Sequence, residues 1–423
     1  MTRSALGLTR MDSWLVLLCA SRTFMNLIGT TYAATLPVLQ KEWNMTGTAA
    51  GSISTGFQLG FAVSLLGFSA LADRAGARRV FLASAALSAA AILAFALLAR
   101  SYLSGLVLNT LVGLSQGGTY TTAIMLIADR YGTDRRGGAV GWLIASSSLG
   151  YALSLALAGL TLPRGGYPLT FLITAGVHLG GVIIAWLALR SVPNVVHPRV
   201  DDLRFATEVL RNPDAMRLTI GYTFHNWELL TMWAWTPAFL AASFAVSGSS
   251  GIAAVAGAAY VAASFHIMGL IASSTMGRAS DRLGRRTVLL ALAVTSAACS
   301  FAFGWMIGWP AAIVVAVGGL YAFTALGDSP VLSAALTEAV RPAYLGSALA
   351  LRSFLGFGAG AVAPLIFGAV LDATNPAGVP PATWGWAYGV LGCGGLVAAL
   401  CAYGPRTGAG NRRPTSPASE STV

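Results

Sequence analysis

Twelve long apolar stretches, separated by short charged turns, make up most of this sequence of 423 residues. A helix needs roughly 20 apolar residues to cross about 30 Å of hydrocarbon. Only 10% of the residues are charged, against roughly 25% in soluble domains, so a soluble fold could not cover its surface. The sequence therefore predicts an all-α membrane protein. Its twelve transmembrane helices are predicted at 14–39, 49–71, 79–99, 102–129, 138–162, 168–190, 217–245, 250–276, 286–308, 311–336, 344–371 and 383–404.

One charged signature occurs twice, each time in a turn between two apolar stretches. The copies occupy 69–79 and 277–286, and both contain an Asp-Arg pair followed by a glycine and further arginines. A repeated turn inside a membrane protein indicates two homologous halves. We predict two pseudo-symmetric six-helix bundles, at 14–190 and 217–404. The remaining segments are predicted as a cytoplasmic N-terminus (1–13), a linker that contains an amphipathic surface helix or is simply solvated (191–216), and a disordered cytoplasmic tail (405–423).

The basic residues are distributed unevenly between the two sides of the predicted membrane protein. If both termini lie on one side, most of the 26 Lys and Arg residues fall in segments on that side. The loops on the other side hold only Lys41, Arg100 and Arg164. Positive residues favour the cytoplasmic side, so we predict a multi-pass protein of the inner (plasma) membrane with both termini in the cytoplasm. These loops account for the net charge of +11, and we expect no nucleic-acid partner.

The sequence gives no sign of a cofactor or a metal site. Its four cysteines lie in separate apolar stretches without the spacing of a metal site. The phosphate-binding pattern G-x-x-x-x-G-K-[ST] does not occur in it. We therefore expect no cofactor, and we expect the protein not to be an enzyme.

The doubled signature resembles the turn between the second and third spans of the major facilitator superfamily, which follows G-x-L-x-D-R-x-G-R-R/K. The first copy departs from this pattern at Ser69 and Ala77. Together with the twelve spans, the resemblance covers about 14–404. It implies alternating access in a lipid bilayer, with spans 1, 4, 7 and 10 lining a central cavity and spans 2, 5, 8 and 11 beside them. We expect a functional monomer. The matching residues are Leu71, Asp73, Arg74, Gly76 and Arg78 in the first copy and Gly277, Asp281, Arg282, Gly284, Arg285 and Arg286 in the second.

The resemblance also implies a gate built from these charges. In the family, the cluster is thought to hold the two halves together on the cytoplasmic side and to stabilise the outward-open state. The glycines permit a tight reversal between helices. Asp129 and Glu338 occupy positions where the charge relay continues. The predicted cytoplasmic gate comprises Asp73, Arg74, Gly76, Arg78, Asp129, Gly277, Asp281, Arg282, Gly284, Arg285 and Glu338.

Four ionisable residues fall well inside predicted spans, namely Arg22, Glu228, Asp328 and Arg352. An Arg or Asp in the middle of a membrane costs roughly 2.5–3.5 kcal/mol on insertion scales. Such residues must face water, one another or a ligand. All four fall on spans that the resemblance places at or beside the central cavity, so we expect them to have functional roles.

The polar residues of spans 1, 7 and 11 form the predicted substrate site. Arg22 is the first choice for binding an anionic group, because a guanidinium stays charged when buried and can hold a carboxylate with two hydrogen bonds. Asn26 follows four residues later and shares its helix face. Tyr222 and Asn226 occupy the pseudo-symmetric face of span 7, and Arg352 is the second choice for the anion.

The buried acidic residues are the predicted proton carriers. Glu228 is the first choice, because a carboxyl near the middle of the membrane can bind and release a proton. His225 is three residues away and could relay the proton or tune Glu228. Asp328 is the other candidate. An alternative that remains open is that Arg22 and Arg352 pair with these two carboxylates and do not bind substrate.

These residues lead to one main interpretation and two alternatives. The main one is a secondary active transporter that moves a small organic anion by alternating access with proton coupling. The first alternative is proton-coupled efflux of an amphipathic or aromatic compound, for which the aromatic residues of span 7 could form a subsite. The second belongs to a different class, a transport-inactive receptor or scaffold on the same fold.

Overall fold

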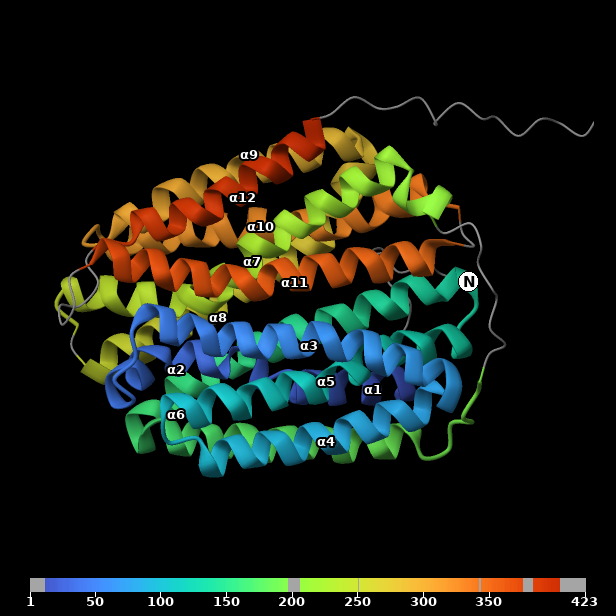
Figure 1. Ribbon diagram of the computed structural model, residues 1–423, viewed down its shortest axis with the longest axis horizontal. Helices are drawn as coiled ribbons and strands as arrows, with labels where there is room; N and C mark the ends of the chain where they lie inside the picture. Colours follow the sequence, from blue (N-terminus) through green and yellow to red (C-terminus); the bar gives the residue numbers. More distant parts are fainter. Residues whose placement is uncertain (1–11, 197–205, 250, 342–343, 376–382, 404–423) are drawn as a thin grey trace, which may run out of the picture.

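Helices account for almost all of the residues that the computed structural model describes, which are 12–196, 206–249, 251–341, 344–375 and 383–403. They run side by side along the long axis of the molecule (Figure 1). Their bounds are α1 (Ser13–Met25), α2 (Ile28–Glu42), α3 (Gly47–Ala75), α4 (Ala77–Leu98), α5 (Tyr102–Arg130), α6 (Thr133–Leu189), α7 (Pro213–Val246), α8 (Gly251–Leu283), α9 (Arg285–Phe303), α10 (Ala311–Ala339), α11 (Leu345–Thr374) and α12 (Gly385–Tyr403), with a short π-helix at Ala206–Leu210 and a 3₁₀ turn at Gly304–Met306.

The prediction of twelve spans is confirmed, although two of them are built differently from the expectation. The first span is divided, because α1 ends at Met25 and α2 begins at Ile28. The fifth and sixth spans are joined in α6, where Gly165 and Gly166 leave the helical conformation. Gly166 has a φ of 63°, which glycine adopts without strain.

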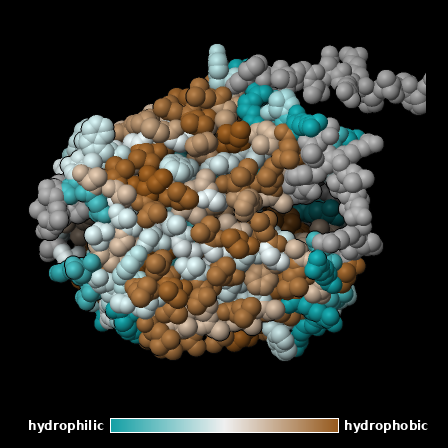
Figure 2. All heavy atoms as spheres, viewed as in Figure 1, coloured by the Kyte–Doolittle hydropathy of each residue, from teal (hydrophilic) through white to brown (hydrophobic). Residues whose placement is uncertain are grey.

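Nine helices of the described chain are individually long and apolar enough to cross a membrane. The joined α6 is counted once among them. The short helices α1 and α2 are not among the nine, because they share one span, and neither is α5, which carries many polar residues. In Figure 2 the apolar side chains cover the middle of the visible face, and hydrophilic ones gather toward its two ends. This distribution is the one expected of a membrane protein.

The two copies of the signature adopt the same local structure. Gly76 separates α3 from α4 with φ 87° and ψ 143°, and Gly284 precedes α9 with φ 87° and ψ 140°. A positive φ of this size favours glycine, and each copy of the signature has a glycine at this position of the reversal. We call the end of the molecule that holds these two turns the arginine-rich end, and the opposite end the arginine-poor end.

The helices form two halves, which lie one above the other in Figure 1. In the N-terminal half, α3 packs on α5, α4 on α5, and α1 on α6. In the C-terminal half, α7 packs on α11, α8 on α10, and α9 on α12. The halves meet where α3 contacts α11, where α6 contacts α8, and where α2 contacts α7. The predictions for 1–11, 197–205 and 404–423 lie outside the described residues.

Helices α3 and α11 approach each other closely between the halves, and glycines make this approach possible. A Cβ atom added at Gly51 would lie 2.3 Å from the backbone oxygen of Pro364, and one at Gly368 would lie 2.1 Å from the backbone oxygen of Gly47. Contacts this short are not available to any residue with a side chain. These positions are near the arginine-poor end, so the two halves are closed against each other there.

Replacing Gly51 by Ala is therefore expected to destabilise this arrangement by about 1–3 kcal/mol, the usual effect of overpacking. Gly67 offers a control on the same helix, because a Cβ there would meet no atom within 4 Å. Thermal unfolding of the detergent-solubilised protein checks the expectation. Gly51→Ala should lower the unfolding temperature and Gly67→Ala should leave it unchanged. Equal effects of the two variants would contradict the role of close packing.

Candidate functional site

Arg22 is buried between three helices of the N-terminal half. Its side chain leaves α1 and is only 5% exposed. One terminal nitrogen donates to the hydroxyl of Thr119 on α5 at 2.8 Å, and the other is 3.5 Å from the hydroxyl of Ser147 on α6. The amide of Asn26, predicted to share the face of Arg22, donates to the same Ser147 hydroxyl at 2.8 Å. The predicted pair is thus brought together, through a serine that the sequence did not point to.

Arg352 holds a comparable position in the C-terminal half. It leaves α11, is 8% exposed, and donates to the hydroxyl of Ser333 on α10 at 2.9 Å. Its guanidinium carbon lies 4.0 Å from the centre of the Tyr222 ring on α7, within range of a cation–π interaction. Asn226 lies one turn further along α7 and donates to the backbone oxygen of Tyr222 at 3.0 Å. Three of the predicted substrate residues therefore form one group.

Tyr120 on α5 connects these two groups, and the sequence analysis missed it. The guanidinium carbon of Arg22 lies 5.8 Å from the centre of its ring. Tyr120 is also within electrostatic range of Arg352 and of Tyr222, which belong to the other half. In the sequence it was marked only as a tyrosine in a span that the resemblance places along the central cavity. Its position puts Tyr120 near the arginines of both halves.

Neither arginine has an acidic partner. None of the ion pairs between described residues involves Arg22 or Arg352. The Nε atoms of both are buried and have no hydrogen-bond acceptor. The alternative in which these arginines pair with Glu228 and Asp328 is therefore not realised in this conformation. A buried charge without a counter-charge is unfavourable, so the site is suited to an anion.

Asp328 and His225 form a close pair within the C-terminal half. The Nδ1 atom of His225 on α7 lies 2.8 Å from Oδ1 of Asp328 on α10, which is close enough for an ion pair, although the angle is not that of a hydrogen bond. The ring centres of His225 and Tyr222 are 5.5 Å apart. A short chain of contacts therefore leads from Arg352 through Tyr222 and His225 to Asp328.

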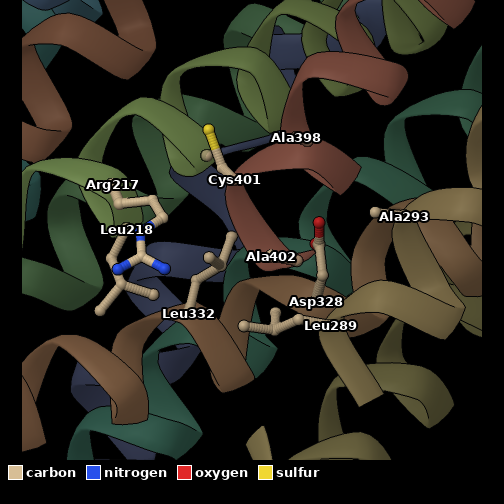
Figure 3. A pocket seen from close by; sticks show the side chains of 10 residues that line it. Arg217, Leu218, Leu289, Ala293, Asp328, Leu332, Ala398, Cys401 and Ala402 are labelled. Atoms are coloured by element: carbon tan, nitrogen blue, oxygen red, sulfur yellow. The ribbon is translucent and has the colours of Figure 1, made fainter. Parts of the chain in front are cut away.

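Asp328 also borders a pocket between α7, α9, α10 and α12. Figure 3 shows its carboxyl on one side of this pocket and the guanidinium of Arg217 on the other, with Cys401 near both. Arg217 lies in the second turn of α7, at the arginine-rich end. All four helices belong to the C-terminal half, so this pocket is separate from the boundary between the halves.

Glu228 faces the interior of the C-terminal half. Its carboxylate accepts hydrogen bonds from the hydroxyls of Ser296 at 2.8 Å and Ser300 at 2.7 Å, both on α9. Ser300 in turn contacts the hydroxyl of Tyr321 on α10. The side of α7 that carries Glu228 is turned toward α9 and α12. His225 contacts Asp328 and not Glu228, so the predicted His225–Glu228 relay is not formed here.

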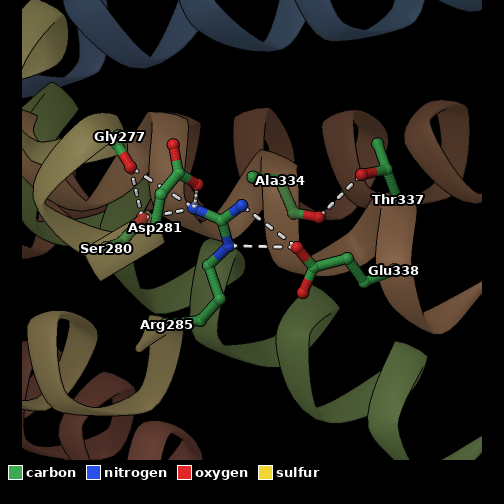
Figure 4. A network of polar contacts seen from close by, with 7 residues as sticks. All are labelled: Gly277, Ser280, Asp281, Arg285, Ala334, Thr337 and Glu338. Carbon is green, nitrogen blue, oxygen red and sulfur yellow. Dashed lines mark hydrogen bonds and ion pairs between the residues drawn. The ribbon is translucent and has the colours of Figure 1, made fainter. Parts of the chain in front are cut away.

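The charges of the second signature copy form a network inside the C-terminal half. Figure 4 shows the guanidinium of Arg285 between the carboxylates of Asp281 and Glu338, at 2.5 and 3.0 Å. Gly277 contributes its backbone oxygen to the same guanidinium, and Arg282 is exposed beside it. Glu338, from α10, thus lies in contact with the charges of the second signature copy. In this conformation the network holds α8, α9 and α10 together within one half.

The first signature copy is arranged differently, as Ala77 in place of an arginine suggests. Arg78 donates to the backbone oxygen of Arg190 at 2.9 Å. The side chain of Asn194 bonds the backbone of the turn around Gly76, donating to the oxygen of Ala75 at 2.8 Å. The remaining predicted gate residues, Asp73, Arg74 and Asp129, are exposed at the arginine-rich end.

A second group that the sequence analysis missed joins the halves at the arginine-poor end. Asp372 lies near the end of α11 and accepts hydrogen bonds from the first residues of α3. One carboxylate oxygen accepts from the backbone N–H of Gly47 at 2.6 Å. The other accepts from the backbone N–H and the hydroxyl of Thr48, at 2.7 and 2.6 Å. The first N–H groups of a helix lack partners within it and carry partial positive charge. Asp372 therefore caps a helix of the opposite half.

Metal ligation finds no support in this arrangement. No group of three or more His, Cys, Asp or Glu side chains that could hold a metal ion occurs in the described ranges. The polar groups that converge between the halves are guanidinium, hydroxyl and amide groups, which bind anions and polar organic molecules.

The fold and this site define a multi-pass membrane transporter of small solutes. The chain matches the family model of the Major Facilitator Superfamily over residues 17–265, which is more than half of its length. The chain belongs to this superfamily, as the doubled signature predicted.

Individual relatives support the same class. The chain is 20% identical to the hexuronate transporter of Bacillus subtilis (strain 168) over 358 residues, or 80% of this chain and 83% of the relative. It is 30% identical to the probable 4-methylmuconolactone transporter of Cupriavidus pinatubonensis (strain JMP 134 / LMG 1197) over 127 residues, or 30% of this chain and 29% of the relative. Among solved structures, a mutant of the nucleoside transporter NupG superposes with a TM-score of 0.76 at 16% identity. That match covers 92% of this chain and 99% of the other and establishes the shared fold.

Proposed function

We propose that this protein is a proton-coupled secondary transporter that carries a small organic anion by alternating access. The observation that carries the proposal is the pair of buried arginines, one from each half, without an acidic partner among the described residues. Arg22 and Arg352 are the proposed anion ligands. Asn26, Tyr222 and Asn226 complete the proposed substrate site. The hexuronate transporter to which this chain is similar is named for an anionic solute, which agrees with this assignment.

The proposed proton-coupling residues are Asp328, His225 and Glu228. Asp328 and His225 are favoured as the pair that binds the proton, because they are linked through Tyr222 to Arg352. A substrate anion at Arg352 would change the electrostatic field at His225 across one aromatic ring. Glu228 accepts hydrogen bonds from serine hydroxyls of α9 and is not part of this chain of contacts. We therefore propose that it assists proton coupling and that the His225–Asp328 pair binds the proton.

The proposed orientation puts the arginine-rich end in the cytoplasm, with both termini on that side. The halves are in close contact at the arginine-poor end, through α3 with α11 and through Asp372. Charges of the second signature copy pair within the C-terminal half. This combination suits a conformation in which the cytoplasmic gate is open. We propose that the signature charges act between the halves in the opposite conformation, and that the monomer is the transporting unit.

One observation favours the efflux alternative. Tyr151 of α6 lies 5.3 Å from Trp233 and 5.7 Å from His266, measured between ring centres, and these two belong to α7 and α8. An aromatic cluster that crosses between the halves could stack on a planar solute. Under this alternative the solute would be aromatic, and protons would move in the direction opposite to it.

Solute-driven proton movement in reconstituted liposomes tests the proposal. The panel contains organic anions, neutral analogues of the same size, and aromatic amphipathic compounds, and a pH-sensitive dye inside the vesicles reports protons. We expect at least one anion to move protons when its neutral analogue does not. Movement of protons by an aromatic compound alone would favour efflux. Solute movement without protons would contradict the coupling, and solute binding without any transport would support the receptor.

A further inference from the structure

We propose that the transported solute carries two negative charges, one for each of the two buried arginines, and is thus a small dicarboxylate or a phosphate monoester. This inference rests on the proposed function, anion transport at the site between the halves. It narrows the substrate from an anion to a dianion.

The side chains of Arg22 and Arg352 both have N–H donors that no hydrogen bond uses. A guanidinium has five N–H donors and stays charged in a protein. Arg22 uses two of its nitrogens, and the second contact, to Ser147, is long at 3.5 Å. Arg352 uses one, to Ser333. All of these partners are neutral hydroxyls, and both Nε atoms are buried without an acceptor. Each guanidinium can therefore still donate two hydrogen bonds to one anionic group.

Arg22 and Arg352 lie near one tyrosine, although they belong to opposite halves. The guanidinium carbon of Arg22 lies 5.8 Å from the centre of the Tyr120 ring, and Arg352 is within electrostatic range of the same residue. Arg352 also lies over the ring of Tyr222, 4.0 Å from its centre. A solute among these tyrosines would have a guanidinium of each half within reach. Its body would contact tyrosine rings, and its two ends would meet positive charge.

The buried carboxylates of the C-terminal half have other partners. Asp328 is paired with His225, and Glu228 is bonded by Ser296 and Ser300. None of the ion pairs between described residues neutralises Arg22 or Arg352. Both guanidinium groups therefore lack a fixed counter-charge from the described residues.

The charge balance decides between one and two negative charges on the solute. When the halves close around a solute, water leaves and the cost of an uncompensated charge rises. A monoanion would neutralise one guanidinium and leave the other buried and unpaired. A dianion would neutralise both. It would also draw the two halves toward each other, because each end is held by a different half. The empty site would resist closure through repulsion between like charges.

The test compares each dianion with a partner of the same size that has lost one charge. Suitable probes are four- to six-carbon dicarboxylates with their mono-amides, and glycerol phosphate with its methyl phosphodiester, which carries one negative charge. Binding is measured by isothermal titration calorimetry on the detergent-solubilised protein, and transport in liposomes. We expect the native protein to prefer at least one dianion over its partner by about tenfold or more, the effect of one hydrogen-bonded charge.

Variants show whether the preference arises at the arginines. In Arg22→Gln and in Arg352→Gln the ratio of the two affinities should fall close to one, while Arg22→Lys and Arg352→Lys should keep part of it. Arg164→Gln removes an exposed positive charge far from the site and should leave the ratio unchanged. Gel filtration and circular dichroism confirm that each variant is folded, and the Lys variants keep the test valid if a Gln variant fails to fold.

Two outcomes would overturn the inference. One is a monoanion that binds and moves as well as every dianion of its size. The other is a dianion preference that both Gln variants retain. These results differ from a failure of the proposed function, in which no anion binds or moves and neutral or aromatic solutes do.

Discussion

Replacing Asp328 by Asn is expected to abolish solute-driven proton movement while solute-for-solute exchange continues. Asn has nearly the shape of Asp, so the contact with His225 and the pocket beside Arg217 should remain. It cannot bind or release a proton, however, and net proton-coupled transport needs both steps. We expect the proton signal in liposomes to fall by at least about 100-fold, as for loss of a group essential to a proton-transfer step. Exchange, measured as release of labelled solute by unlabelled solute, should stay within a few-fold of the native protein.

Glu228→Gln provides the matched comparison, since it also removes one buried carboxyl from the C-terminal half. Gln keeps an oxygen that can accept from Ser296 and Ser300. Proton movement should therefore decrease much less than in Asp328→Asn. The reverse order would identify Glu228 as the proton carrier. Equal and complete losses would mean that the two carboxyls act together.

The positions of these charged residues could be predicted from sequence, but their pairings could not. Ionisable residues are rare inside apolar spans, so Arg22, Glu228, Asp328 and Arg352 could be singled out without a structure. Which residue a side chain faces depends on how far its helix is rotated in the bundle. Glu228 and His225 are three residues apart on α7, yet one faces α9 and the other faces α10. When a helix is buried on most sides, its apolar residues do not show a single face, so its rotation in the bundle cannot be predicted from the sequence.

The fold was predictable for a related reason. Twelve apolar runs and a repeated turn are properties of contiguous sequence, and Gly76 and Gly284 mark both reversals. The break after Met25 is a different matter, because Asn26 and Leu27, which lie at the break, are not residues that end a helix as glycine or proline does. Tyr120 and Asp372 were missed because their importance comes from partners in the other half of the chain. Asp372 in particular lies just past a predicted span and has the sequence context of an ordinary loop residue.

Replacing Asp372 by Ala is expected to open the arginine-poor end. The carboxylate is the acceptor for three hydrogen bonds from the start of α3, two of them from backbone N–H groups. Hydrogen bonds to a charged group contribute about 1.5–3 kcal/mol when they are lost singly. These bonds exist only while α11 and α3 are together, so their loss acts directly on the balance between conformations. An effect of about 2 kcal/mol would change the ratio of closed to open forms roughly 30-fold.

Distances between spin labels would measure that ratio. The exposed residues Lys41, at the end of α2, and Ala245, at the end of α7, lie in opposite halves at the arginine-poor end and can be changed to labelled cysteines after the native cysteines are replaced. Asp372→Ala should shift the distribution to longer distances. Thr48→Val removes only the hydroxyl bond and keeps both backbone bonds, so its shift should be smaller. If Asp372→Ala leaves the distances unchanged, the packing of Gly51 and Gly368 against their backbone neighbours must by itself keep this end closed. The double variant Asp372→Ala with Gly51→Ala would then show how the hydrogen bonds of Asp372 and the packing of Gly51 combine. If both stabilise the same interface, the shift in the double variant should differ from the sum of the two single shifts.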